Sequence, residues 1–169
     1  VFTCGLNKID LLFDKVDFRP SAIVAVNDFV LEQNAGFYNQ SEIPLFLNST
    51  GIKYKIKRRE NICFLHSSDF KGEFAADCAI SINQGHSVTF VAMQLAFHMG
   101  FHEVALVGCD HNFATKGPAN MTVTSQDTDP NHFDPNYFAG GVKWQLPDLA
   151  ESELAYLIAK NKFESAGRN

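Results

Sequence analysis

One stretch sets the expected architecture: Asn83-Gln-Gly-His-Ser-Val-Thr-Phe-Val-Ala-Met-Gln-Leu-Ala-Phe-His-Met-Gly-Phe-His-Glu-Val-Ala-Leu-Val-Gly-Cys-Asp110. Apolar residues recur at helical spacing over residues 87–99, Ser87 is a suitable N-cap, and Gly100 suits a left-handed C-terminal cap. Residues 104–107 are apolar without alternation, which predicts a strand covered on both faces. The stretch therefore predicts a turn, a helix packed on a sheet, and a buried parallel strand.

The rest of the chain follows the same alternation. Apolar runs at residues 22–26, 44–47 and 61–65 predict three more strands, and residues 147–167 predict a long helix. Strands that alternate with helices indicate an α/β fold with a mostly parallel sheet. A chain of 169 residues favours one domain over residues 1–169, large enough to bury a real core.

Charge and hydropathy exclude two classes of protein. The formal net charge is −5 and no basic stripe runs along the chain, which argues against a nucleic-acid binder. No apolar run approaches the length of a membrane span, and the first residues lack the pattern of a signal peptide. The lysines and arginines near residue 55 alternate with apolar residues, and we expect them on the wet face of an edge strand over residues 52–57.

The cysteine pattern indicates the compartment. The four cysteines form no CxxC pair and no zinc-binding spacing, and each lies in an apolar run: Cys4, Cys63, Cys78 and Cys109. Buried free thiols of this kind are typical of a reducing compartment. We therefore expect a soluble, cytoplasmic protein.

One long segment has no periodicity. Residues 112–141 are rich in Gly, Pro, Asn, Asp and Thr, and a stretch of this length is usually functional or disordered. It also carries His132, Phe133, Tyr137 and Phe138, which a disordered linker would rarely need. We interpret residues 112–141 as a lid over an active site.

The polar residues at the ends of the expected elements indicate a ligand site. Asp110 directly follows the expected strand, and open α/β sheets bind ligands at the carboxyl ends of their strands. Gly85, His86 and Ser87 open the helix, where free backbone N–H groups and the positive end of the helix dipole favour an anion. An ordinary helix cap and a turn aspartate are the structural alternatives.

These segments resemble a known family of proteins. Gly85-His-Ser-Val-Thr89 and Gly100-Phe-His-Glu-Val-Ala-Leu-Val-Gly-Cys-Asp110 resemble the domain shared by archaeal 6-hydroxymethylpterin diphosphokinase-like proteins and the motility-associated factors linked to flagellin glycosylation. That domain is similar to the bacterial family-42 sialyltransferases. Cys4-Gly-Leu-Asn-Lys8, Val24-Ala-Val-Asn-Asp28 and Lys162-Phe-Glu-Ser-Ala-Gly-Arg-Asn169 agree with the same pattern.

The resemblance implies a Rossmann-like sheet with helices on both faces. The sialyltransferases use CMP-sialic acid without a metal. The family's Gly-rich opening loop is absent here, and the chain ends before the family's next strand. The resemblance therefore implies a domain truncated at both ends, with a sheet edge left exposed or covered by a partner chain.

The resemblance also implies roles for single residues. Asn7 matches a position that contacts the nucleotide, although an N-cap for a helix at Ile9 is an equal alternative. His132 falls where the sialyltransferases have a histidine base, and a base with a pKa near ~6.5 could deprotonate an acceptor hydroxyl. Tyr137 could stabilise the leaving phosphate. A surface-loop histidine is the alternative for His132.

Three functions follow as hypotheses. The first is a nucleotide-sugar-dependent glycosyltransferase domain without a cofactor, in which Gly85, His86, Ser87, Asn7 and Asp110 bind the nucleotide. The second is a 6-hydroxymethylpterin diphosphokinase-like transferase that uses ATP and Mg held by Asp28 and Asp110. The third is a non-catalytic nucleotide-binding domain. The expected partners are a nucleotide or nucleotide sugar and a glycan or small-molecule acceptor, with a homo-oligomer left open.

Overall fold

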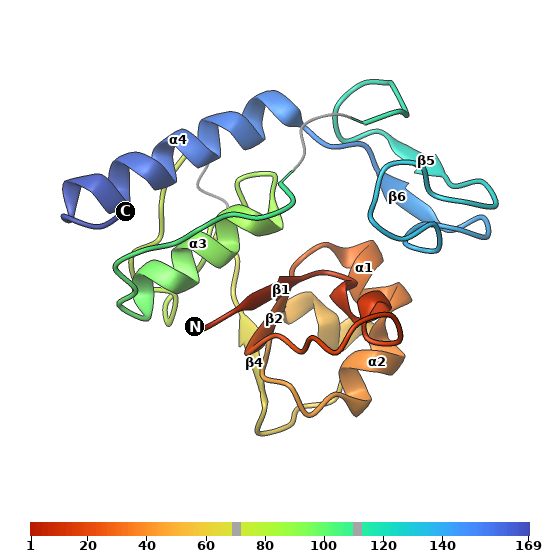
Figure 1. The fold of residues 1–169 in the computed structure, drawn as a ribbon, viewed down its shortest axis with the longest axis horizontal. Helices are drawn as coiled ribbons and strands as arrows, with labels where there is room; N and C mark the ends of the chain where they lie inside the picture. The colour runs from red at the N-terminus through yellow and green to blue at the C-terminus, as the bar shows by residue number, and fades with distance from the viewer. Residues whose placement is uncertain (69–71, 110–112) are drawn as a thin grey trace.

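The main element of the fold is a parallel four-stranded sheet. The computed structural model describes residues 1–68, 72–109 and 113–169 (Figure 1). The strands lie in chain order: β1 (Cys4–Leu6), β2 (Ala22–Ala25), β3 (Leu45–Asn48) and β4 (Ile62–Leu65). All three neighbouring pairs are parallel. This confirms the α/β, Rossmann-like class with a parallel sheet flanked by helices.

Helices follow the strands as the alternation predicts. They are, in chain order, the 3-10 helix η1 (Ile9–Leu12), α1 (Asp28–Gln33), α2 (Ala35–Gln40), the 3-10 helix η2 (Ser49–Tyr54), α3 (Val88–His98) and α4 (Leu149–Ser165). No helix among the described residues is long and apolar enough to cross a membrane.

Both faces of the sheet are buried. Alternate residues of β2 point to opposite faces, so Ile23 packs with Leu31 of α1 and Tyr38 of α2, whereas Val24 packs with Val91 and its neighbours on α3. Each residue of β2 is buried. The apolar run without alternation at residues 22–26 was therefore correctly predicted as a strand with two covers.

The central helix has the predicted ends. The hydroxyl oxygen of Ser87 accepts a hydrogen bond from the backbone N–H of Thr89, as an N-cap does. Gly100 has a φ of 84° directly after the last turn, a conformation that favours glycine. On its other side, α3 packs against Ala155 and Phe163 of α4.

The strand expected at residues 104–107 is not part of the sheet. The N–H of Val104 donates to the carbonyl of Asn169, and the N–H of Asn169 donates to the carbonyl of His102. This segment therefore pairs with the end of the chain, and Leu106 and Val107 are 46% and 92% exposed. An apolar run becomes a buried strand only where a neighbouring strand hydrogen-bonds to its backbone. Here β1 does not hydrogen-bond to residues 104–107.

Two smaller predictions are wrong. Residues 52–57 do not form an edge strand, because the side chain of Asn48 caps a 3-10 helix, η2, that includes Ile52 and Tyr54. The cysteines are free as expected, but Cys4 and Cys63 are exposed. Their apolar neighbours predicted burial, which holds for Cys78 alone.

Over the residues that the structure describes, the expected lid packs against the start of the chain and α1. β5 (Thr122–Thr124) and β6 (Lys143–Gln145) form an antiparallel pair at one side of it. Tyr137 and Phe138 are buried and belong to the same cluster as α1 and β3. The segment therefore contributes to the core of the domain.

Two lysines near the start of the chain bind residues of the lid. The buried Lys8 ammonium donates to the carbonyl of Tyr137 and to the side chain of Gln33, each at 2.7 Å, and lies 4.8 Å from the ring centre of Phe138. The Gln33 side chain in turn donates to the carbonyl of Lys143. Farther along, Lys15 pairs with the carboxylate of Asp134, which is 1% exposed.

Candidate functional site

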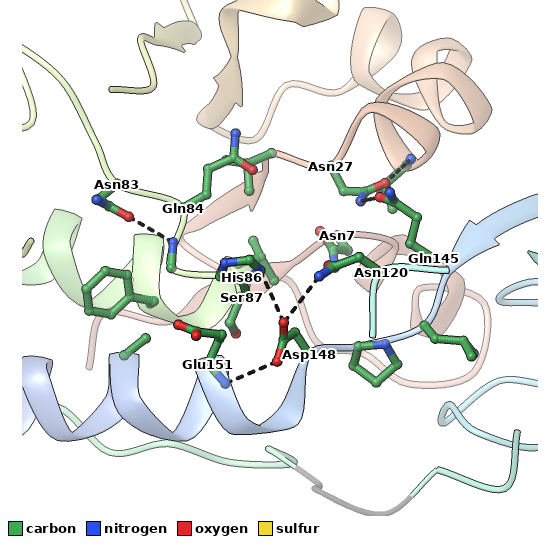
Figure 2. Close-up of a pocket in the computed structure, with 18 of the residues that line it drawn as sticks. Asn7, Asn27, Asn83, Gln84, His86, Ser87, Asn120, Gln145, Asp148 and Glu151 are labelled. Atoms are coloured by element: carbon green, nitrogen blue, oxygen red, sulfur yellow. Dashed lines mark hydrogen bonds and ion pairs between the residues drawn. The ribbon is translucent and has the colours of Figure 1, made fainter. Parts of the chain in front are cut away.

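One cavity of about 500 Å³ collects most of the predicted site residues. It lies between the ends of β1 and β2, the loop before α3, the lid and the first turn of α4. Figure 2 shows polar side chains from these segments around it. The predicted residues that line it are Asn7, Gly85, His86, Ser87, His132 and Tyr137. Residues far apart in the sequence thus meet in one place.

The loop before α3 is a tight turn of unusual backbone. Gly85 and His86 have φ angles of 50° and 58°, in the left-handed region. A Cβ on Gly85 would lie 2.3 Å from the ring of the buried Phe90, so only glycine fits. The loop is held by the side chain of Asn83, which accepts from the N–H of Gly85 at 3.0 Å (Figure 2).

Two backbone amides of this loop are bonded within the turn, and two have no partner among the described residues. The N–H of Gly85 binds Asn83, and the N–H of Ser87 donates to the carbonyl of Gln84 at 2.9 Å. Within the described residues, the N–H groups of His86 and Val88 have no hydrogen-bond partner, and both residues line the cavity. An anion at the start of α3 would therefore meet these two amides.

His132 is held by a buried carboxylate. Its Nδ1 lies 2.7 Å from Oδ2 of Asp129, whose side chain is 1% exposed. The imidazole stacks on Tyr137 with ring centres 4.1 Å apart and planes 3° apart. Burial lowers the pKa of His132, the nearby Lys8 lowers it further, and Asp129 acts in the opposite direction. The neutral imidazole is thus favoured near neutral pH.

Tyr137 and Asn7 meet beside this histidine. Burial raises the pKa of Tyr137 to about 12, and a hydrogen bond from Asn7 acts against that rise. Tyr137 therefore keeps its hydroxyl proton at neutral pH. Asn7 has a left-handed φ of 52°, and its Oδ1 is buried with no hydrogen-bond partner among the described residues. Asn7 does not cap η1, whose N-cap is Lys8.

Polar residues that the sequence reasoning missed complete the wall. Asp148 is the N-cap of α4, accepts from Asn120 at 3.2 Å, and lies 3.9 Å from Nδ1 of His86 (Figure 2). Asn27 and Gln145 of β6 both line the cavity, and Asn27 donates to Gln145 at 3.2 Å. Asp148 had a readable signal, because Asp directly before an apolar helical pattern is a standard N-cap. Asn27 and Gln145 come together only through the tertiary fold.

Of the two predicted acidic residues, the one that the structure describes, Asp28, does not join this group. Asp28 is exposed at the start of α1, accepts a hydrogen bond from Thr50, and does not line the cavity. Asp110, predicted for the nucleotide and for Mg, lies outside the described residues. Within the parts of the chain that are described, no three His, Cys, Asp or Glu side chains are placed to hold a metal ion.

A second cavity of about 820 Å³ lies elsewhere, between the N-terminal residues and residues 103–107. Its lining is mostly apolar, with Phe2, Phe18 and Met99 among its residues, and it contains none of the predicted site residues. The predicted site residues that line a cavity therefore all line the smaller one.

Comparisons with known proteins identify no relative. No protein-family model, curated protein or solved structure matches this chain.

Proposed function

We propose that this chain is a nucleotide-sugar-dependent glycosyltransferase domain, similar to the sialyltransferases, in which His132 is the general base. One observation carries the proposal: a histidine bonded to a buried carboxylate lines the same cavity as a helix N-terminus with unpaired backbone amides. A glycosyltransferase needs a base for the acceptor and a binding site for the donor phosphate in the same cavity. The amides suit a nucleotide phosphate, and the imidazole suits a hydroxyl.

The proposed step is a single displacement. The acceptor hydroxyl oxygen forms a bond to the anomeric carbon of the donor sugar, and the bond from that carbon to the nucleotide phosphate breaks. The hydroxyl proton passes to Nε2 of His132, and the phosphate leaves with the bonding electron pair. Because Nδ1 of His132 faces Asp129, Nε2 is the ring nitrogen available for this proton.

The donor half of the cavity fits a nucleotide in three respects. The N–H groups of His86 and Val88 could bind the phosphate, and the buried Oδ1 of Asn7 requires a donor such as a hydroxyl or amino group. Tyr137 retains its proton and could donate to the leaving phosphate. A volume of about 500 Å³ is within the range of small-molecule sites.

Ligand-dependent thermal unfolding tests the proposal. A cytidine nucleotide at 100 times its Kd should stabilise the domain by about 2.7 kcal/mol, which raises Tm by roughly 5–10 °C for a chain of this length. The expected result is a shift with cytidine nucleotide and EDTA. A shift that requires ATP and Mg would favour the diphosphokinase-like alternative, and binding without any turnover would favour a non-catalytic domain.

A further inference from the structure

The carboxylate of Asp129 is buried and fully used. Its Oδ1 accepts from the backbone N–H of Asn131 at 2.8 Å, and its Oδ2 accepts from the backbone N–H of Phe138 at 3.1 Å. Nδ1 of His132 completes the set at 2.7 Å. The two backbone N–H groups can only donate, so both oxygens of Asp129 act as acceptors, as the oxygens of a carboxylate do.

This arrangement fixes the proton on the imidazole. A carboxylate with no proton cannot donate to Nδ1, so Nδ1 must carry the hydrogen of the neutral ring. Nε2 then has a lone pair, and among the residues that the structure describes none hydrogen-bonds to it. His132 lines the cavity, with Tyr137 stacked on one side of its ring and Phe138 edge-on. The ring therefore has little freedom to turn.

We propose that Asp129 is the positioning residue of the site: it holds the imidazole of His132 in the tautomer whose Nε2 can accept a proton from a ligand in the cavity. The inference rests on the proposed function for the identity of that ligand, an acceptor hydroxyl. The tautomer itself does not depend on the reaction.

Asn at position 129 would break this arrangement in either orientation. If its NH₂ group replaces Oδ1, it faces the N–H of Asn131. If it replaces Oδ2, it faces the N–H of Phe138 and Nδ1 of His132, and the imidazole gains a hydrogen bond only by moving its proton to Nε2. That second tautomer has no lone pair toward the cavity and cannot act as a base.

The test is ¹⁵N NMR of the histidine side chains at pH 7.5 on the whole chain, with His132→Gln used to assign the signals. In the wild-type protein we expect protonated Nδ1 and unprotonated Nε2. In Asp129→Asn we expect a substantial population with protonated Nε2. Asp127→Asn is the matched control, because Asp127 is an exposed carboxylate in the same loop and its loss removes the same charge.

Two results would overturn the inference. One is wild-type His132 with its proton on Nε2, which needs no variant and so does not depend on whether Asp129→Asn folds. The other is a folded Asp129→Leu protein with the wild-type tautomer, because leucine offers Nδ1 of His132 no acceptor in any orientation, whereas Asn with its NH₂ group in place of Oδ1 still offers one. If the proposed transfer also occurs, its rate should fall by ~10²-fold or more in Asp129→Asn, with nucleotide Kd changed less than about twofold. The expected tautomers in a protein without transferase activity would refute the proposed function and leave the role of Asp129 intact.

Discussion

Replacing Lys8 by Met should change how stability depends on pH. Lys8 is 8% exposed, and burial lowers its pKa from the usual 10.5 to about 8. Because the folded-state pKa lies below that of the unfolded chain, the unfolded chain binds more protons between about pH 8 and 10.5. The contribution of Lys8 to the free energy of unfolding therefore rises with pH across this window.

The size of the effect follows from the two pKa values. Relative to pH 7, Lys8 should add about 1.4 kcal/mol to the free energy of unfolding at pH 9 and about 2.5 kcal/mol at pH 10. Other groups also titrate in this range, but they do so in both proteins and cancel when Lys8→Met is subtracted from wild type. Met keeps the length of the stem and removes only the ammonium group.

Urea unfolding at pH 7, 8, 9 and 10 measures this difference, with the m-value checked for two-state behaviour. Lys53→Met, at an exposed lysine in η2, controls for the loss of one positive charge. A difference between wild type and Lys8→Met that stays constant from pH 7 to pH 10, or falls, would refute the assignment of a buried, cationic Lys8 beneath the lid.

Three further predictions concern the loop and the lid. Val88→Pro removes a backbone N–H at the first position of α3, where proline is tolerated because the preceding Ser87 already has an extended ψ of 130°. Titration calorimetry should show nucleotide binding weakened by roughly tenfold or more. Val88→Thr keeps the N–H and should bind the nucleotide normally. Gly85→Ala should lower the free energy of unfolding by about 1–3 kcal/mol through its positive φ and its clash with Phe90, and Gly100→Ala, also at positive φ but with nothing within 4 Å, should cost less. Equal losses for the two alanine variants would contradict the packing at Gly85. Asp134→Asn should lower the free energy of unfolding by about 1–3 kcal/mol at pH 7, because Lys15 loses its buried carboxylate partner. Since Lys15 lowers the pKa of Asp134, the difference in stability between wild type and Asp134→Asn should shrink as the pH falls through that pKa. A difference that grows in acid would contradict the pairing.

The parallel sheet was predictable because its signal is local. An apolar run such as residues 22–26 reports burial directly, and β2 is buried at every residue. The caps of α3 were also readable, since Ser87 and Gly100 act through neighbouring backbone groups. Residues 104–107 carry the same apolar signal and yet lie outside the sheet. The pairing of one strand with another depends on the tertiary fold, and the local sequence of a strand does not determine its partner.

The candidate site was predictable to a smaller extent. His132 and Tyr137 were selected from a family resemblance, and the structure brings both to the cavity that also contains Ser87. Asp129 was missed as a partner of His132, although the two are three residues apart. The two backbone N–H groups that bind its carboxylate, those of Asn131 and Phe138, become its partners only in the folded chain.

Under the proposed function, the domain transfers a glycosyl group from a nucleotide sugar with His132 as base. The most direct test is product formation from a CMP-activated sugar and an oligosaccharide acceptor in the presence of EDTA, with wild type compared against His132→Gln. We predict that wild type forms the glycoside and releases CMP, and that His132→Gln binds CMP with a Kd within about twofold of wild type but transfers ~10²-fold or more slowly. Undiminished transfer by His132→Gln, or CMP binding by wild type with no glycoside formed, would contradict the proposed function.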